Sequence, residues 1–220
     1  MCGRYASYTP PAAIARLVNA MPPVPNVAPS WNVAPSQQAM AVRRHPKTGE
    51  RHLDLLTWGF VPHWAEDPKA ERKPINARGE TVATTPMFRA AFTHNRCLVP
   101  ADAYYEWQAT DGGKQPYAFA RRDGAPMMLA GLWDIWKGHG AELIRSFTII
   151  TTSANVIARP IHDRMPVIIE AKGWPVWLGD GGGNPSDLIR APGDDVLRVW
   201  PVSRRLNSPG NNEAGLLEGG

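Results

Sequence analysis

The sequence predicts an α+β protein with a mainly antiparallel β-sheet or barrel as its core and a few short helices at the periphery. The chain of 220 residues contains 22 prolines and 20 glycines, which interrupt it too often for long helices. Between these interruptions lie short runs rich in β-branched and aromatic residues, the composition that strands favour. No long polar stretch divides the chain, so we expect one domain with a substantial core.

The predicted strands are bounded by Gly, Pro and Asp residues and recur through most of the chain. They cover residues 40–43, 52–58, 97–107, 117–121, 127–136, 147–152, 165–169 and 197–200. Strand alternation near the end of 97–107 sends Tyr104 and Glu106 to one face, and Tyr105 and Trp107 to the other.

The first predicted helix follows a capping residue, Thr9, and two prolines that fit the first turn of a helix. Its apolar residues are three and four positions apart and form one stripe of Ile14, Leu17, Val18 and Met21. Shorter helices are predicted near 87–92, 154–159 and 185–189. The proline-rich segment 25–35 should run extended over the surface. We expect the domain to cover 1–206 and residues 207–220 to form a loose C-terminal tail.

Composition also limits the cellular compartment and the kind of binding partner that we expect. Cys2 and Cys97 are too few for a disulfide framework and indicate a reducing, cytoplasmic environment. No apolar run approaches the roughly 20 residues of a membrane span, and the N-terminus lacks the plan of a signal peptide. The net charge of +4, with 18 arginines against 6 lysines, suits a polyanionic partner such as nucleic acid. A GC-rich genome would favour arginine equally.

The opening MCGRYA places a cysteine second. A small second residue lets an aminopeptidase remove Met1, and the freed α-amine of Cys2 has a pKa of about 7.7 to 8.0. Such an amine can condense with an aldehyde to a Schiff base, and the neighbouring thiol can then close a thiazolidine ring. The alternative is that Cys2 is a small apolar residue at the start of a buried strand.

Two further stretches carry groups suited to binding and proton transfer. PINARGET (74–81) puts Asn76, Arg78 and Glu80 into a turn-like segment, which could equally be an ordinary loop with a surface ion pair. Within ADAYYEW (101–107), Glu106 lies between aromatic residues. Desolvation there would raise the pKa of its carboxyl towards the range useful for acid–base catalysis, whereas a solvent-facing glutamate would stay ordinary.

IHDRMP (161–166) combines His162, the usual acid or base at neutral pH, with Arg164, which could hold a phosphate. Its alternative is a helix-to-strand junction with a solvated charge cluster. Metal binding is a poor interpretation, because the six histidines show no ligand spacing with Cys or acidic residues. Among nine tryptophans most should be core, but WGFVPHW (58–64) could offer a flat ring to an unstacked base.

Together these stretches resemble one family. MCGRY, WNVAPSQ, WGFVPHW, PINARGET, RCLVPADAYYEW, ITTSAN and IHDRMPVI occur in the order seen in the SOS-response-associated peptidase (SRAP) domain of abasic-site processing proteins. The resemblance runs from residue 1 to about residue 202, and several motifs in order are more specific than any one of them.

The resemblance implies the SRAP fold and a sensor that shields abasic sites in single-stranded DNA by a covalent crosslink during the DNA damage response. Carried over by motif, Cys2 would form the crosslink, Asn76 would position its amine, and Glu106 and His162 would be the acid–base pair. The resemblance also implies contacts to the DNA backbone from Arg4, Arg78 and Arg164, while Arg89, Trp64 and Trp107 match the family pattern more loosely. We expect a monomer without metal or cofactor.

Two other classes stay open. An N-terminal-nucleophile hydrolase such as a glutamine amidotransferase also matures to an N-terminal Cys-Gly, but its glutamine-holding arginine motif is not evident here. A non-covalent reader of modified DNA could use the same groove without bond formation. We interpret any peptidase activity as the removal of Met1, in cis or by an aminopeptidase.

Overall fold

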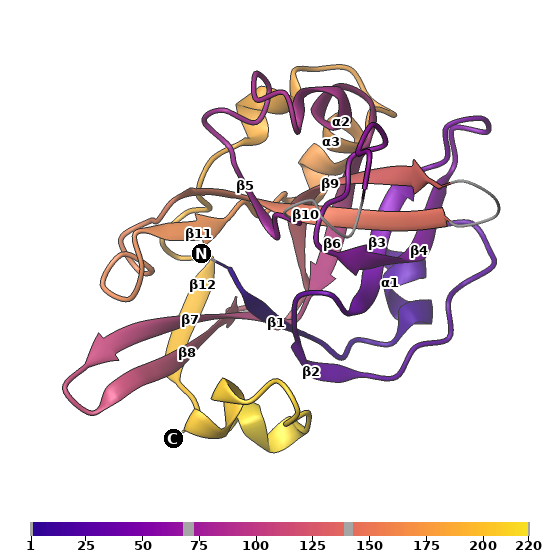
Figure 1. The fold of residues 1–220 in the computed structure, drawn as a ribbon. Helices are drawn as coiled ribbons and strands as arrows, with labels where there is room; N and C mark the ends of the chain where they lie inside the picture. The colour runs from indigo at the N-terminus through magenta and orange to yellow at the C-terminus, as the bar shows by residue number, and fades with distance from the viewer. Residues whose placement is uncertain (1, 68–72, 139–142, 220) are drawn as a thin grey trace.

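The strands form two sheets in the computed structural model, which describes residues 2–67, 73–138 and 143–219 (Figure 1). The five-stranded sheet has the order β12-β8-β7-β1-β2. Its strands are β1 (Arg4–Ser7), β2 (Ser30–Val33), β7 (Ala103–Thr110), β8 (Gly113–Arg121) and β12 (Leu197–Pro201). All of its pairings are antiparallel.

The seven-stranded sheet closes on itself, because β10 pairs with both β4 and β9 at the two ends of the path β10-β4-β3-β6-β9. Its strands are β3 (Gln38–Arg44), β4 (Arg51–Trp58), β5 (Asn76–Arg78), β6 (Arg96–Ala101), β9 (Met127–Lys137), β10 (Leu143–Ser153) and β11 (Arg164–Pro166). Closure satisfies both edges of each barrel strand, so this sheet leaves few free edges. The predicted α+β class with a mainly antiparallel sheet and barrel is confirmed.

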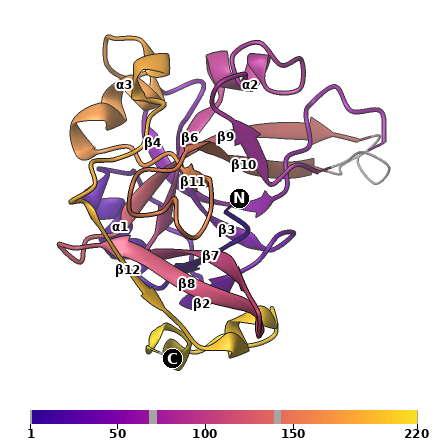
Figure 2. The same ribbon diagram turned by 90° about the vertical axis from the view of Figure 1, so that its left-hand side faces the viewer.

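Short helices lie at the edges of the sheets. They are α1 (Pro11–Leu17), α2 (Arg89–His94) and α3 (Trp174–Leu178), with 3₁₀ turns η1 (Ala171–Gly173), η2 (Pro185–Leu188), η3 (Arg204–Asn207) and η4 (Ala214–Leu217). In both views α2 and α3 cover one end of the molecule, and the C-terminal turns lie at the other, beside β8 and β2 (Figure 2). Among the residues described, no helix is long and apolar enough to cross a membrane.

The predicted strand 97–107 is two strands that belong to different sheets. The chain leaves the barrel after Ala101 and enters the five-stranded sheet at Ala103. Asp102 fixes this corner, because its carboxylate accepts the backbone N–H groups of Tyr8 at 2.6 Å and Thr9 at 2.8 Å. The corner carries Glu106 away from the barrel and places it opposite Tyr117 on β8.

Some predicted elements were wrong. The predicted helix near 154–159 is a series of turns, because Pro160 has no N–H with which to continue a helical hydrogen-bond pattern. The extended segment 25–35 contains strand β2, whose Asn32 and Val33 are buried. Strands β1 and β5 and helix α3 were not predicted, since each is only three to five residues long.

The loose tail expected at 207–220 is packed onto the sheet as far as residue 219. Leu216 is fully buried in a cluster with Tyr105, Ala118 and Leu206. The Asn32 side chain donates to the backbone oxygens of Ser208 at 3.0 Å and Asn211 at 2.8 Å. One apolar anchor and these polar bonds hold a segment whose glycines and prolines suggested disorder.

Candidate active site

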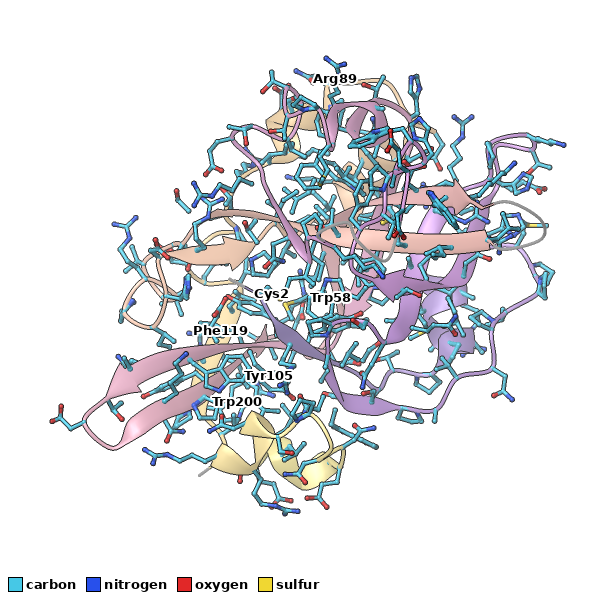
Figure 3. All side chains as sticks on the ribbon, in the orientation of Figure 1. Cys2, Trp58, Arg89, Tyr105, Phe119 and Trp200 are labelled. Carbon is cyan, nitrogen blue, oxygen red and sulfur yellow. The ribbon has the colours of Figure 1, made fainter. Side chains whose placement is uncertain are left out.

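Cys2 lies just before β1 and is fully buried in the core between the two sheets. The same apolar cluster contains Trp58 of the barrel and Tyr104 and Phe119 of the five-stranded sheet, and Figure 3 shows Cys2 beside Trp58 and Phe119. Burial, and secondly the charge of Glu106, raise the pKa of the Cys2 thiol well above its usual range. The thiol is therefore neutral at rest, and a free thiolate is not the resting nucleophile.

Glu106 projects from β7 on the same face as Tyr104, as strand alternation predicted. Its side chain is 3% exposed, and burial raises the pKa of its carboxyl. The prediction of a desolvated carboxyl is confirmed, and the alternative of a solvent-facing glutamate is wrong. A carboxyl that holds its proton to a higher pH than usual can act as an acid and, after giving up that proton, as a base.

His162 ends the turn that precedes β11. Its Nδ1 accepts the backbone N–H of Arg164 at 2.9 Å and lies 2.9 Å from Oδ1 of Asp163. A backbone N–H and a carboxylate oxygen thus both contact Nδ1, and together they fix the orientation of the imidazole.

Glu106 and His162 line one open cavity of about 570 Å³. Its other lining residues are Gly3, Arg4, Trp107, Lys114 and Asn207. Lys114 and Asn207 were not predicted. The sequence did hold a signal for Lys114. Asp111-Gly112 marks a tight hairpin turn after β7, and the register of that hairpin places Lys114 opposite Ala109, two residues along the strand from Trp107.

Arg4 and Trp107 form the rim of this cavity. The Arg4 guanidinium donates to Oδ1 of Asn32 at 2.9 Å and to the Leu206 carbonyl at 3.2 Å, and it lies 6.0 Å from the Trp107 ring centroid. The Trp107 indole N–H donates to Oδ1 of Asn207 at 2.7 Å. Both side chains are therefore held in fixed positions beside the carboxyl and the imidazole.

Asn76, Arg78 and Arg164 line a second cavity, of about 540 Å³. They meet because β10 lies between β5 and β11, with Thr151 opposite both Arg78 and Pro166. The Asn76 amide donates to the Ile75 carbonyl at 2.9 Å, and its buried Oδ1 accepts no hydrogen bond from any described residue. The structure thus groups Asn76 with the two arginines and does not place it in the lining of the first cavity.

Arg164 is already engaged in an ion pair. Its two terminal nitrogens bind both oxygens of Glu80, one pair at 2.9 Å, and one of them also donates to the Thr151 carbonyl at 2.7 Å. The hydrogen bond from Arg164 is the main cause that lowers the pKa of the Glu80 carboxyl. Arg78, by contrast, has an exposed side chain.

Arg89 and Trp64 line neither cavity. Arg89 is exposed on α2, at the opposite end of the molecule from the C-terminal segment, and Figure 3 shows it well away from Cys2. Trp64 is 49% exposed and follows His63, whose Nδ1 lies 2.8 Å from a carboxylate oxygen of Asp134. Over residues 2–67, 73–138 and 143–219, no three His, Cys, Asp or Glu side chains cluster as a metal site would require.

Solved structures share this fold. A crystal structure of a protein from Bacteroides thetaiotaomicron superposes with a TM-score of 0.89 at 20% identity over 100% of both chains. A second, from Bordetella bronchiseptica, superposes with a TM-score of 0.78 at 28% identity and covers 92% of this chain and 100% of its own.

Sequence comparison gives the family. The abasic site processing protein YoaM of Bacillus subtilis is 37% identical over 99% of this chain and 98% of its own length. The abasic site processing protein YedK of Escherichia coli is 31% identical over 99% of both chains. The family described as SOS response associated peptidase (SRAP) matches residues 1–209. The chain therefore belongs to the SRAP family of abasic site processing proteins.

Proposed function

We propose that this protein captures abasic sites in single-stranded DNA as a covalent adduct with Cys2 and so shields the lesion. The observation that carries the proposal is the cavity lined by the buried Glu106 carboxyl, by His162 and by Gly3, the residue that directly follows Cys2. The charge of Glu106 also acts on the Cys2 thiol. The full-length similarity to abasic site processing proteins of two bacteria supports the same substrate.

The amine of Cys2 acts first in the proposed reaction, once Met1 has been removed. An abasic deoxyribose opens to an aldehyde, and His162 is placed to move the proton that ring opening requires. The amine nitrogen adds to C1′ to give a carbinolamine. Glu106 in its protonated form gives a proton to the carbinolamine hydroxyl, which leaves as water, and an iminium forms between the nitrogen and C1′.

The thiol closes the ring in the second step. The sulfur of Cys2 bonds to C1′, the C=N double bond becomes a single bond, and the thiol proton passes to the Glu106 carboxylate, which restores the acid. The adduct has the mass of DNA plus the protein lacking Met1, minus one water. The same residues run in reverse would release the DNA, because protonation of sulfur or nitrogen is the microscopic reverse of closure.

Binding of the flanking strand rests on Arg4 and Arg78, joined by Arg164 when its ion pair with Glu80 opens, and on stacking against Trp107. The net charge of +4 favours association with a polyanion. An unstacked, mobile sugar suits a single strand better than a duplex. We propose a monomer, because every residue in this scheme comes from one chain.

The test uses a single-stranded oligonucleotide with one uracil, converted to an abasic site by uracil glycosylase. We expect a band that survives SDS and heat, with the mass given above, and none with Cys2→Ala. Cys97→Ala is the matched control, because Cys97 is the second buried cysteine and lies on β6 within the core. An equal yield from Cys2→Ala would falsify covalent capture through this residue.

Two variants of the experiment separate the other classes. An N-terminal tag that prevents Met1 removal should abolish the adduct, because the α-amine is then an amide. Binding of Cys2→Ala without an adduct, together with no adduct from the wild type, would indicate a non-covalent reader. Labelling of Cys2 by a glutamine analogue would instead indicate an amidotransferase-like hydrolase.

A further inference from the structure

The C-terminal residues 203–217 contact the first cavity as well as the sheet. Tyr105 and Trp200 point towards this segment in Figure 3 and share an apolar cluster with Leu206 and Leu216. The Trp200 indole donates to the Leu217 carbonyl at 2.9 Å. A segment with this much buried contact is positioned rigidly enough to orient side chains beside it.

Asn32 is the centre of that contact. It lies on β2 in the WNVAPSQ motif, is 1% exposed, and has no role in the chemistry proposed above. Its amide donates to the carbonyls of Ser208 and Asn211 at 3.0 and 2.8 Å, while its Oδ1 accepts from the Arg4 guanidinium at 2.9 Å. One side chain therefore ties the C-terminal segment to a cation at the cavity rim.

Asn207 makes the second connection. Its Oδ1 accepts the Trp107 indole N–H at 2.7 Å, and Asn207 itself lines the cavity. The Arg4 guanidinium also donates to the neighbouring Leu206 carbonyl at 3.2 Å. Two adjacent residues of η3 thus fix the cation and the aromatic ring that face each other across 6.0 Å.

We propose that Asn32 and Asn207 are positioning residues for DNA. Through them the C-terminal segment holds Arg4 for a backbone phosphate and Trp107 for a base next to the abasic sugar. This inference rests on the proposed function and adds a role for a segment outside its chemistry. Holding these side chains in advance reduces the conformational entropy lost on binding, so the effect falls on affinity and not on the bond-forming steps.

The first test is Asn207→Ala, whose exposed side chain can be removed without loss of the core. We expect undamaged single-stranded DNA to bind about fivefold more weakly, as one orienting hydrogen bond would give. The concentration of abasic DNA that gives half the maximal rate of adduct formation should rise in the same proportion. Asn184→Ala is the matched control, because that exposed asparagine caps η2 with the same kind of bond and lines neither cavity.

Two further variants keep the proposal testable. Asn207→Asp retains the acceptor for the indole, so at about 0.5 M salt, where its added charge is screened, it should bind as the wild type does. Asn32→Ser shortens the side chain that holds Arg4. If the variant is folded, the slope of log affinity against log salt should fall by about 0.7, the value for one phosphate contact in single strands.

The outcomes separate this inference from the proposed function. Wild-type affinity in Asn207→Ala, alongside weaker binding in Arg4→Gln, would overturn the positioning role and leave covalent capture intact. A change in the saturated rate with unchanged affinity would also overturn it. Loss of the adduct in the wild type would instead contradict the proposed function, whatever the asparagine variants do.

Discussion

Glu106 is the residue on which the two proposed bond-forming steps converge. We expect Glu106→Gln to slow adduct formation by about 10²-fold, the lower end of what a positioned acid or base contributes. The carboxamide keeps the size and most of the polarity of the side chain, so binding of undamaged DNA should not change. Glu170→Gln, which removes a carboxylate paired with Arg121 outside both cavities, is the control. Quenched time courses on abasic DNA measure the rates.

The same carboxyl makes stability depend on pH. Burial raises the pKa of Glu106 in the folded state, so the folded protein holds this proton at pH values where the unfolded chain has lost it. The contribution of Glu106 to the free energy of unfolding should therefore fall as pH rises from the ordinary glutamate pKa through the raised value. Each unit of pKa displacement corresponds to about 1.4 kcal/mol.

Urea unfolding of the wild type and Glu106→Gln at about pH 4 and about pH 8 measures this dependence, since those values bracket the titration of a raised carboxyl. The glutamine variant should gain stability relative to the wild type as pH rises, because it has no carboxyl to ionise. A constant difference between the two proteins across this range would contradict a raised pKa.

Glu80 competes with DNA for Arg164 in our proposal. Its carboxylate makes the two-pronged contact that a phosphate would make with the same guanidinium. We expect Glu80→Gln to bind undamaged single-stranded DNA several-fold more tightly at low salt, with a smaller gain at high salt. Fluorescence anisotropy at two salt concentrations measures this, and unchanged affinity would mean that Arg164 does not contact the strand.

At the scale of elements, β10 organises the second cavity. It pairs with β5 and β11, so the PINARGET and IHDRMP motifs, far apart in the sequence, lie on either side of Thr151. Neither neighbour is longer than three residues, and both depend on β10 for their position. The placement of Asn76, Arg78 and Arg164 therefore follows from the packing of β10 in the barrel.

Gly131 on β9 tests how tightly that barrel is packed. A methyl group there would lie 2.8 Å from Sγ of Cys97, 3.0 Å from the Thr148 carbonyl and 3.2 Å from Val99. We expect Gly131→Ala to lower the free energy of unfolding by about 1 to 3 kcal/mol, the usual cost of overpacking. Combining it with Cys97→Ala should recover part of the loss, because the nearest atom is removed. Urea titrations of the single and double variants measure the coupling, and strict additivity would exclude a clash with the sulfur.

Prediction of elements from the sequence was most successful where a strand was long and its hydrophobic pattern was clear. The barrel strands were anticipated because each carries a run of apolar or β-branched residues. Strands β1 and β5 are short and contain arginines, and they form by pairing with longer strands. Local composition gives no information about such pairing. The split at Asp102 was also hidden, since it depends on bonds to Tyr8 and Thr9.

At the scale of the whole molecule, the C-terminal segment stabilises the fold through Leu216. We expect Leu216→Ala to lower the free energy of unfolding by about 2 to 5 kcal/mol, because a fully buried leucine leaves a cavity. Leu17→Ala on α1 is the control, since that side chain is 46% exposed and should cost far less. Equal unfolding midpoints for Leu216→Ala and the wild type would indicate that the segment adds nothing to global stability.

The candidate site was predicted in its chemistry more than in its arrangement. Residue types and the family motifs identified Glu106 and His162, which share a cavity, and Cys2, which is electrostatically coupled to Glu106. Motif matching did not reveal that Asn76 lies with the arginines, nor that Glu80 occupies Arg164, because both depend on three-dimensional register. Asn207 was missed because a polar segment rich in Gly and Pro gives no sign of where it docks.

The burial of Cys2 has a consequence for how the protein is synthesised. Because the Cys2 side chain packs between the two sheets of the folded chain, an exopeptidase has freer access to the peptide bond before Cys2 on the nascent chain. Strand β1 pairs with β7, which begins at Ala103, so the N-terminus stays open until about a hundred residues have followed it. At about 5 to 20 residues per second, translation leaves it exposed for roughly 5 to 20 seconds. Removal of Met1 at the ribosome within that interval would determine the fraction of molecules that carry a free Cys2 amine.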